Sequence, residues 1–391
     1  MQVSVNLSEE ILRWVIEHVQ MDTLPSTIVE YLNLWMSGTK SPTFNQIEKV
    51  SKATGIPLGY FFLQTPPQED LSLVSYRTID SVELENPSRN LIDTMHDMEQ
   101  IQLWMRDQLI SDAATTLQYV GSIKSNGSVA TFAKSMRKWL GLNIDWYKKA
   151  RTVEEAFSII RTAISNAGTL VMLSGIVGNN THRALDINEF RAFAMVDEYA
   201  PLIFINSNDS VNGKLFSLLH EMAHVFLGES SLFNDRFSTA GKVSRTETLC
   251  NAVAAEILVP QQAFVTAWAD AIIELDAEQA IEELAHDFKC GITVIARRAY
   301  DNHFIEYELY QAIAQRAVQY YNDSRRRKKE RGEQGGDFYR TAASRIDRRF
   351  FGMLVNSVQA GKTLYSDAFR LTNTNRTTFA TLASSVGGGI R

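Results

Sequence analysis

The chain has little cysteine: only Cys250 and Cys290 occur in its 391 residues. Two thiols are too few for a disulfide-stapled secreted scaffold or for a four-cysteine zinc module, so we expect both to be free in a reducing compartment. The opening residues, MQVSVNLSEE, lack the basic and apolar stretches of a secretory signal. No run approaches the roughly 18 apolar residues that a membrane span requires. These absences predict a cytoplasmic protein without a membrane partner.

A strong excess of basic charge is also lacking. The chain has 39 lysines and arginines against 45 aspartates and glutamates, a formal net charge of −6. This balance argues against nucleic-acid binding by the whole surface, because phosphate contacts dominate such binding. Residues 297–349 nevertheless carry 13 basic and 8 acidic side chains. A local basic surface is therefore a candidate DNA contact, although we interpret the arginine run at 325–331 as a solvated helix face.

The organisation along the chain is that of a multidomain globular protein, with 45% apolar and 21% charged residues. Apolar periodicity predicts a mainly α protein with one small α+β domain, made of a short mixed sheet and a metal-binding helix and flanked by helical domains. The predicted domains are a degenerate helix-turn-helix-like module at 1–66, a helical connector at 67–150, the α+β domain at 151–265, and a C-terminal helical region at 266–391.

Individual elements follow from the same patterns. Helices are predicted outside the α+β domain at 9–19, 27–36, 44–54, 90–110 and 129–139. Within that domain we expect helices at 153–166, 211–227 and 247–259, and strands at 168–173, 190–196 and 201–206.

The motif His220-Glu-Met-Ala-His224 carries the sharpest chemical signal. Histidines at i and i+4 project from one face of a helix, so that both rings can reach a single Zn²⁺ ion. Glu221, beside the first histidine, is suited to act as the general base toward an attacking water molecule. The flanking residues are apolar and would bury the helix. The alternative is an amphipathic helix with two ordinary histidines.

A catalytic zinc site requires three protein ligands and an open position. The carboxylates available after the second histidine are Glu229, Asp235, Glu247 and Glu256. The first two fall in the polar stretch 228–246, which we interpret as a loop, whereas Glu247 opens a helix that would hold a ligand rigidly. Glu247 is therefore the predicted third ligand. Asn251, one turn further on, is a candidate to hydrogen-bond a ligand or to cap backbone, and Glu256 is interpreted as a surface carboxylate.

Three further features have two interpretations each. The strand at 190–196 is either a plain sheet strand or an edge strand that pairs with an extended peptide substrate. The segments 280–288 and 292–302, the second carrying Arg297 and Arg298, form either a second helix-turn-helix or a packing hairpin. Cys250 lies close to the predicted ligand Glu247, but a single cysteine inside a helix is typical of core packing. His286 and His303 are expected to be surface or capping residues.

Together these motifs resemble the ImmA/IrrE family of metallopeptidases. The likeness is carried by the histidine motif, by Glu247-x-x-x-Asn251-x-x-Ala254-Ala255-Glu256-Ile-Leu-Val-Pro260, and by the strand pair within 192–206. Trp35-x-x-Gly38 and Tyr60-Phe61-Phe62 resemble the N-terminal helix-turn-helix module that many members carry. Residues 336–341 resemble the C-terminal part of the long members.

This resemblance implies a zinc metalloendopeptidase of the HExxH type. His220, His224 and Glu247 match the family's Zn²⁺ ligands, and Glu221 matches its catalytic glutamate. Family members cut DNA-binding repressors, which implies a repressor as the protein substrate. Some long members lie beside a toxin gene and are thought to act as antitoxins. The alternative function is therefore a DNA-binding transcriptional regulator, or an antitoxin bound to a partner toxin, with a structural or vestigial zinc site.

The N-terminal module departs from the family pattern. Only 21 residues separate Trp14 from Trp35, which is short for a complete additional helix. Residues 1–63 also carry 4 basic and 6 acidic side chains, whereas a DNA reader should be locally basic. We therefore expect a degenerate module that binds a protein or packs on its neighbour, with DNA binding as the alternative.

Overall fold

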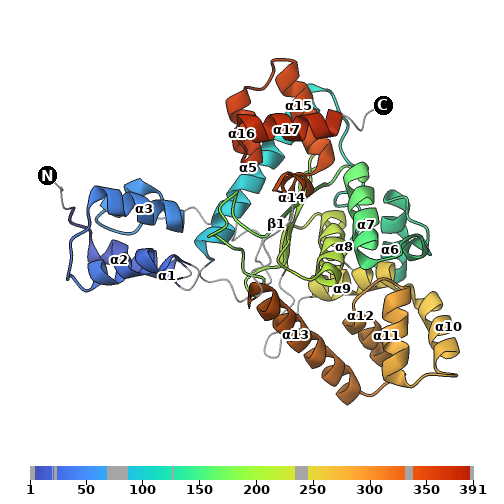
Figure 1. Cartoon of the computed structure of the whole chain (residues 1–391). Coiled ribbons are helices and arrows are strands. Elements are labelled where there is room, and N and C mark those ends of the chain that lie inside the picture. The colour runs from blue at the N-terminus through green and yellow to red at the C-terminus, as the bar shows by residue number, and fades with distance from the viewer. Residues whose placement is uncertain are drawn as a thin grey trace.

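The computed structural model describes residues 5–19, 21, 24–67, 87–125, 127–233, 245–330 and 338–387. Within this part, the chain is mainly helical and contains one four-stranded mixed sheet, as the sequence predicts (Figure 1). No described helix combines the length and the apolar character needed to cross a membrane.

The N-terminal helices form a small bundle with a core of its own. They are α1 (Glu9–Glu17), α2 (Ser26–Met36), α3 (Phe44–Thr54) and the 3-10 helix η2 (Leu58–Phe62). Fully buried Ile11, Leu32, Ile47 and Phe61 join them in one apolar cluster. In Figure 1 this bundle lies apart from the sheet and its helices. The three predicted helices are confirmed, and the helix-turn-helix character of the module stays a prediction.

Three of the helices that follow also lie where the sequence predicts them: α5 (Arg89–Ser111), α6 (Val129–Trp139) and α7 (Val153–Ala167). The short 3-10 helix η3 (Trp146–Lys149) was not predicted. Serine or threonine hydroxyls cap the first turns: Ser88 accepts from Leu91 N, Ser128 from Thr131 N and Thr152 from Glu155 N. The predicted bounds differ from the observed ones by a single residue at most.

The sheet is buried on both faces. Its strands are β1 (Leu170–Ser174), β2 (Ala192–Met195), β3 (Leu202–Asn206) and β4 (Ser231–Phe233), in the order β1-β3-β2-β4. β1 is parallel to β3, and β2 is antiparallel to both β3 and β4. Alternate residues enter two different cores: Val171 and Ile203 pack toward α7 and α8 (Val211–Leu227), while Met172 and Phe204 pack toward α5. Burial of both faces explains why the strands are apolar throughout.

The sheet decides one open interpretation and corrects another. Of the two interpretations of the strand at 190–196, the plain sheet strand is confirmed and the edge strand is wrong, because β2 lies between β3 and β4. The stretch 228–246 is not wholly a loop, because it contains β4. Gly228 ends α8 with a positive φ of 76° and turns the chain back toward the sheet. A strand of three residues is too short for an alternating pattern to reveal it.

The C-terminal helices cover two sides of the molecule. They are α9 (Arg245–Leu258), α10 (Gln261–Ala271), α11 (Ala277–Asp287), α12 (Ile292–Asp301), α13 (Tyr307–Glu330), α14 (Phe338–Arg345), α15 (Arg348–Gln359), α16 (Tyr365–Thr372) and α17 (Arg376–Gly387). Residues of α9 to α12 share the core of α8, whereas residues of α14 to α17 share the core of α5 across the opposite sheet face (Figure 1). Buried Asp347 ties α15 to the sheet by accepting from Val171 N at 3.2 Å.

Candidate metal centre

The centre is built on the helix pair α8 and α9. Ser210 Oγ accepts from Gly213 N at 3.0 Å and caps the start of α8, and Gly228 ends this helix. Between these caps α8 is buried along most of its length, so His220 and His224 are 0% and 2% exposed. Their rings lie on consecutive turns with centroids 4.9 Å apart. Helix α9 packs against this face of α8 and presents Glu247 from its first turn.

Three side chains converge at one point. The Nε2 atoms of His220 and His224 lie 3.1 Å apart. Glu247 places Oε2 at 3.1 Å from Nε2 of His220 and Oε1 at 3.1 Å from Nε2 of His224. The ligand-type atoms of these three residues all lie within 4.8 Å of one another. The structure thus brings together the two histidines and the carboxylate that the sequence singles out, including a residue 23 positions beyond the motif.

The donor set fits a divalent ion that prefers nitrogen and oxygen ligands. Tetrahedral zinc with bonds of about 2.0–2.1 Å separates its ligand atoms by roughly 3.3 Å, close to the spacings seen here. Nδ1 of His220 donates to Oδ1 of Asn251 at 2.9 Å, so Nε2 of that ring carries the lone pair. The hydrogen bond expected of Asn251 is therefore present, and it directs Nε2 of His220 toward Glu247.

The electrostatics of the group also favour a cation. The two imidazoles outweigh burial and hold the pKa of Glu247 well below its usual value. Burial lowers the pKa of His220, whereas contacts with Cys250 and Glu247 outweigh burial and raise the pKa of His224. Glu247 therefore favours its charged form, and the group stabilises a positive charge on His224 beside it. A metal ion would take the place of the proton on His224.

Glu221 lies on α8 beside the first histidine and is fully buried. Its Oε2 accepts a hydrogen bond from the Ser231 hydroxyl, and its Oε1 has no hydrogen-bond partner among the described residues. Burial raises the pKa of Glu221 to about 7, although His224 and Ser231 act in the opposite direction. A carboxyl group that titrates near neutrality is suited both to take up and to release a proton. Sequence reasoning missed Ser231, because it follows the motif in a stretch interpreted as a loop.

The other candidate carboxylates lie elsewhere. Glu229 is exposed in the turn after α8, and Asp235 lies outside the described residues. The interpretation of Glu256 as a surface carboxylate is wrong: its side chain is only 12% exposed and pairs with Arg298 at 2.7 Å. Glu256 also accepts from Gln261 N at the start of α10, so it joins α9, α10 and α12. Helix α9 ends just before Pro260, and this brings the carboxylate over the next helix start.

Cys250 is fully buried on α9, and burial raises the pKa of its thiol. The same thiol contacts His224, so Cys250 combines the expected core packing with a position beside the metal-binding group. Sequence reasoning noted its proximity to Glu247 but gave no sign of the contact with His224.

The segment proposed as a second helix-turn-helix is the pair α11 and α12. Arg297 pairs with Asp301 at 2.9 Å and lies over the rings of Tyr300 and Tyr310, each 5.8 Å away. Arg298 is engaged by Glu256. Because both arginines of α12 have partners within the chain, the geometry favours the packing hairpin. His286 and His303 are exposed, as predicted.

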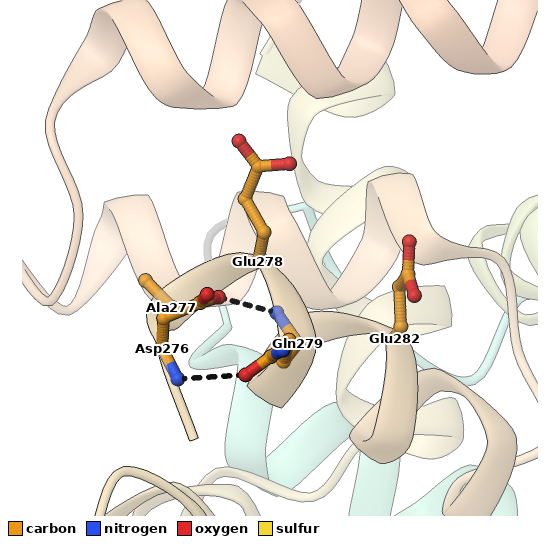
Figure 2. A pocket seen from close by; sticks show the side chains of 5 residues that line it. All are labelled: Asp276, Ala277, Glu278, Gln279 and Glu282. Atoms are coloured by element: carbon orange, nitrogen blue, oxygen red, sulfur yellow. Dashed lines mark hydrogen bonds between the residues drawn. The ribbon is translucent and has the colours of Figure 1, made fainter.

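A separate surface hollow lies at the first turn of α11 (Figure 2). There Asp276 N donates to Gln279 Oε1 at 3.2 Å, and Gln279 N donates to Asp276 Oδ1 at 2.9 Å. Glu278 pairs with Arg316 of α13 at 2.7 Å. These polar groups cap and anchor α11, so the hollow provides no second reactive centre.

Comparison with known proteins agrees with this geometry. Residues 169–300 match the IrrE N-terminal-like domain, and residues 346–385 match a domain of unknown function (DUF8813). No curated protein and no solved structure matches the chain. The first match contains the sheet, both helices of the metal-binding group and the chain as far as α12. Residues 169–300 are therefore a domain of the ImmA/IrrE metallopeptidase family.

Proposed function

We propose that this protein is a zinc-dependent endopeptidase in which His220, His224 and Glu247 hold the metal and Glu221 is the general acid and base. The observation that carries the proposal is the convergence of two imidazole nitrogens and one carboxylate within 3.1 Å of each other. Glu221 adds a buried carboxyl group with a free oxygen at the same helix turn.

A bound zinc ion supplies a Lewis acid that activates water and polarises a peptide carbonyl. Glu221 takes a proton from the attacking water and passes it to the nitrogen of the leaving amine, so the carboxyl group is unchanged after each cycle. Its pKa of about 7 makes both transfers feasible near neutral pH. Asn251 keeps the His220 ring in one orientation throughout.

The substrate we propose is a DNA-binding repressor, which would make the cleavage regulatory. Support comes from the ImmA/IrrE domain at residues 169–300 and from the presence of an N-terminal helical module in the same chain. The side chain of Glu247 is 26% exposed, against 0% and 3% for those of the two histidines, so a substrate peptide reaches the group on the α9 side.

The test combines metal analysis with a substrate trap. Purified wild-type protein should contain about one zinc per chain by mass spectrometry of metals, and His220→Ala should contain essentially none. Glu221→Gln should keep zinc but stop cleavage, because glutamine cannot accept the proton. The zinc-loaded Glu221→Gln variant should then retain its substrate in a pull-down. A repressor that wild type cuts would support the proposal; a retained, uncut toxin would favour the regulator instead, and absence of zinc from wild type would refute the metallopeptidase.

A further inference from the structure

The residue that contacts the proposed general base lies on β4, the strand at one edge of the sheet. Helix α8 ends at Gly228, and the chain returns to pair with β2, where Ser231 lies opposite Ala194. Ser231 is 5% exposed, and its hydroxyl donates to Oε2 of Glu221. A residue of β4 thus reaches back to a side chain ten positions earlier in the chain.

We propose that Ser231 is a positioning residue for Glu221, an inference that rests on the proposed function. The terminal torsion of a glutamate side chain is broad, so a carboxylate on a helix needs an outside contact to hold one orientation. Ser231 occupies one carboxylate oxygen. The other oxygen, Oε1, is buried and free of hydrogen bonds within the described residues, and it is left to accept the proton.

The neighbouring residue Ser230 has a different contact. It therefore serves as a control that distinguishes the positioning of Glu221 from the pairing of the strands. Ser230 Oγ accepts from Val196 N at 3.0 Å, which fastens the start of β4 beside the end of β2. Ser231 directs its hydroxyl to Glu221 instead. The partners of the two hydroxyls, Val196 N and Glu221 Oε2, are not among the candidate ligand atoms. Loss of the Ser231 hydroxyl should therefore affect the carboxylate and leave metal affinity nearly unchanged.

The experiment uses the full-length chain and the matched pair Ser231→Thr and Ser231→Val. Threonine and valine have the same shape and both suit a strand, so the pair differs only in the hydroxyl. The first readout is zinc affinity, measured by competition with a chromophoric chelator. The second is the affinity of the cobalt-substituted protein for acetohydroxamate, followed by visible absorption. Acetohydroxamate binds the metal and gives its proton to a neighbouring carboxylate, so it reports the orientation of Glu221 without turnover.

We expect zinc affinity within about twofold of wild type for both variants. Acetohydroxamate should bind Ser231→Val about tenfold more weakly, because one charge-assisted hydrogen bond to the carboxylate is lost. Ser231→Thr should stay within about twofold of wild type. Ser230→Ala, which removes a strand contact only, should do the same, and circular dichroism verifies that each variant is folded.

Equal acetohydroxamate affinity for the threonine and valine variants would overturn the proposal. So would an equal loss in Ser230→Ala, because the effect would then come from the strand and not from the hydroxyl. If the threonine and valine variants both lost zinc, Ser231 would be supporting the metal site, and the proposal would also fall. A wild-type chain that binds neither zinc nor cobalt would instead refute the proposed function itself, so the two failures are distinguishable.

Discussion

At the scale of single residues, α9 supplies both a candidate ligand and the group that orients another. Glu247 and Asn251 lie one turn apart, and they contact the two sides of the His220 ring. This division leaves Nε2 of His220 unprotonated, which is the state that metal binding would require. The orientation of His220 therefore depends on an amide that is not itself a candidate ligand.

Replacing Asn251 with alanine should weaken zinc binding about 10- to 100-fold, because the ring loses the partner that fixes its tautomer. Asn251→Asp keeps an acceptor at the same place and should retain most of the affinity. Chelator competition on the purified variants measures both values. Unchanged zinc affinity in the alanine variant would show that packing alone orients His220.

Cys290 provides a pH-dependent prediction away from the metal group. Burial raises the pKa of its thiol to about 12, and only 6% of the residue is exposed. Because the thiolate is the reactive form, alkylation by iodoacetamide at pH 8 should be at least about a hundredfold slower in the native chain than in guanidinium. The native rate should increase as the pH rises toward 12. Mass spectrometry of the peptide containing Cys290 provides the measurement, and rapid native labelling at pH 8 would contradict it.

At the scale of elements, the sequence predicted the helices that have a repeating apolar pattern and missed the strand β4, which is too short to have one. The motif on α8 follows from 3.6-residue periodicity with histidines at i and i+4, and the helix at 247 follows from its own apolar pattern. β4 has three residues and therefore no detectable period, so Ser231 was missed. The ion pair of Glu256 with Arg298 joins residues 42 positions apart, and no local pattern encodes such a pairing.

The conformational requirement of the turn that joins α8 to β4 can be tested by adding a single methyl group at Gly228. Gly228 has a φ of 76°, and a Cβ there would meet the Cα of Gly121 at 3.0 Å. Gly228→Ala should therefore lower the free energy of unfolding by about 1–3 kcal/mol. Gly352→Ala is the matched control, because it lies inside α15 and a Cβ there meets no atom within 4 Å. The control should be neutral or stabilising by up to about 1 kcal/mol in denaturant unfolding. Equal effects of the two changes would argue against strain at Gly228.

At the scale of the whole molecule, the sheet is enclosed by segments from distant parts of the chain. Helix α5 and helices α14 to α17 share one core on the face opposite α7 and α8. Arg161 of α7 donates to the carbonyls of Val171 and Ile346, at 3.1 and 3.2 Å, and so ties this arrangement together. The C-terminal helices are therefore part of the fold that supports the metal-binding group.

Removing residues 346–391 should expose the apolar side chains of one sheet face and make the remaining chain aggregate or unfold. Removing residues 1–67 is the matched deletion, because the N-terminal bundle has a separate core. That variant should remain monodisperse, with a Tm close to that of the full chain. Size-exclusion chromatography and thermal unfolding of both deletions provide the comparison. A stable, well-folded chain 1–345 would contradict this view of the C-terminal helices.

The enclosure of the sheet also affects the order in which the chain can fold during synthesis. A ribosome delivers the residues from His220 to Asn251 well before it delivers Phe350 and Leu354, which cover the far side of the strands. A nascent chain therefore contains all the residues of the candidate metal centre before one face of the sheet is fully covered. The fold around the candidate metal centre is therefore complete only after α15 to α17 have been synthesised, and the activity proposed above would appear no earlier than that.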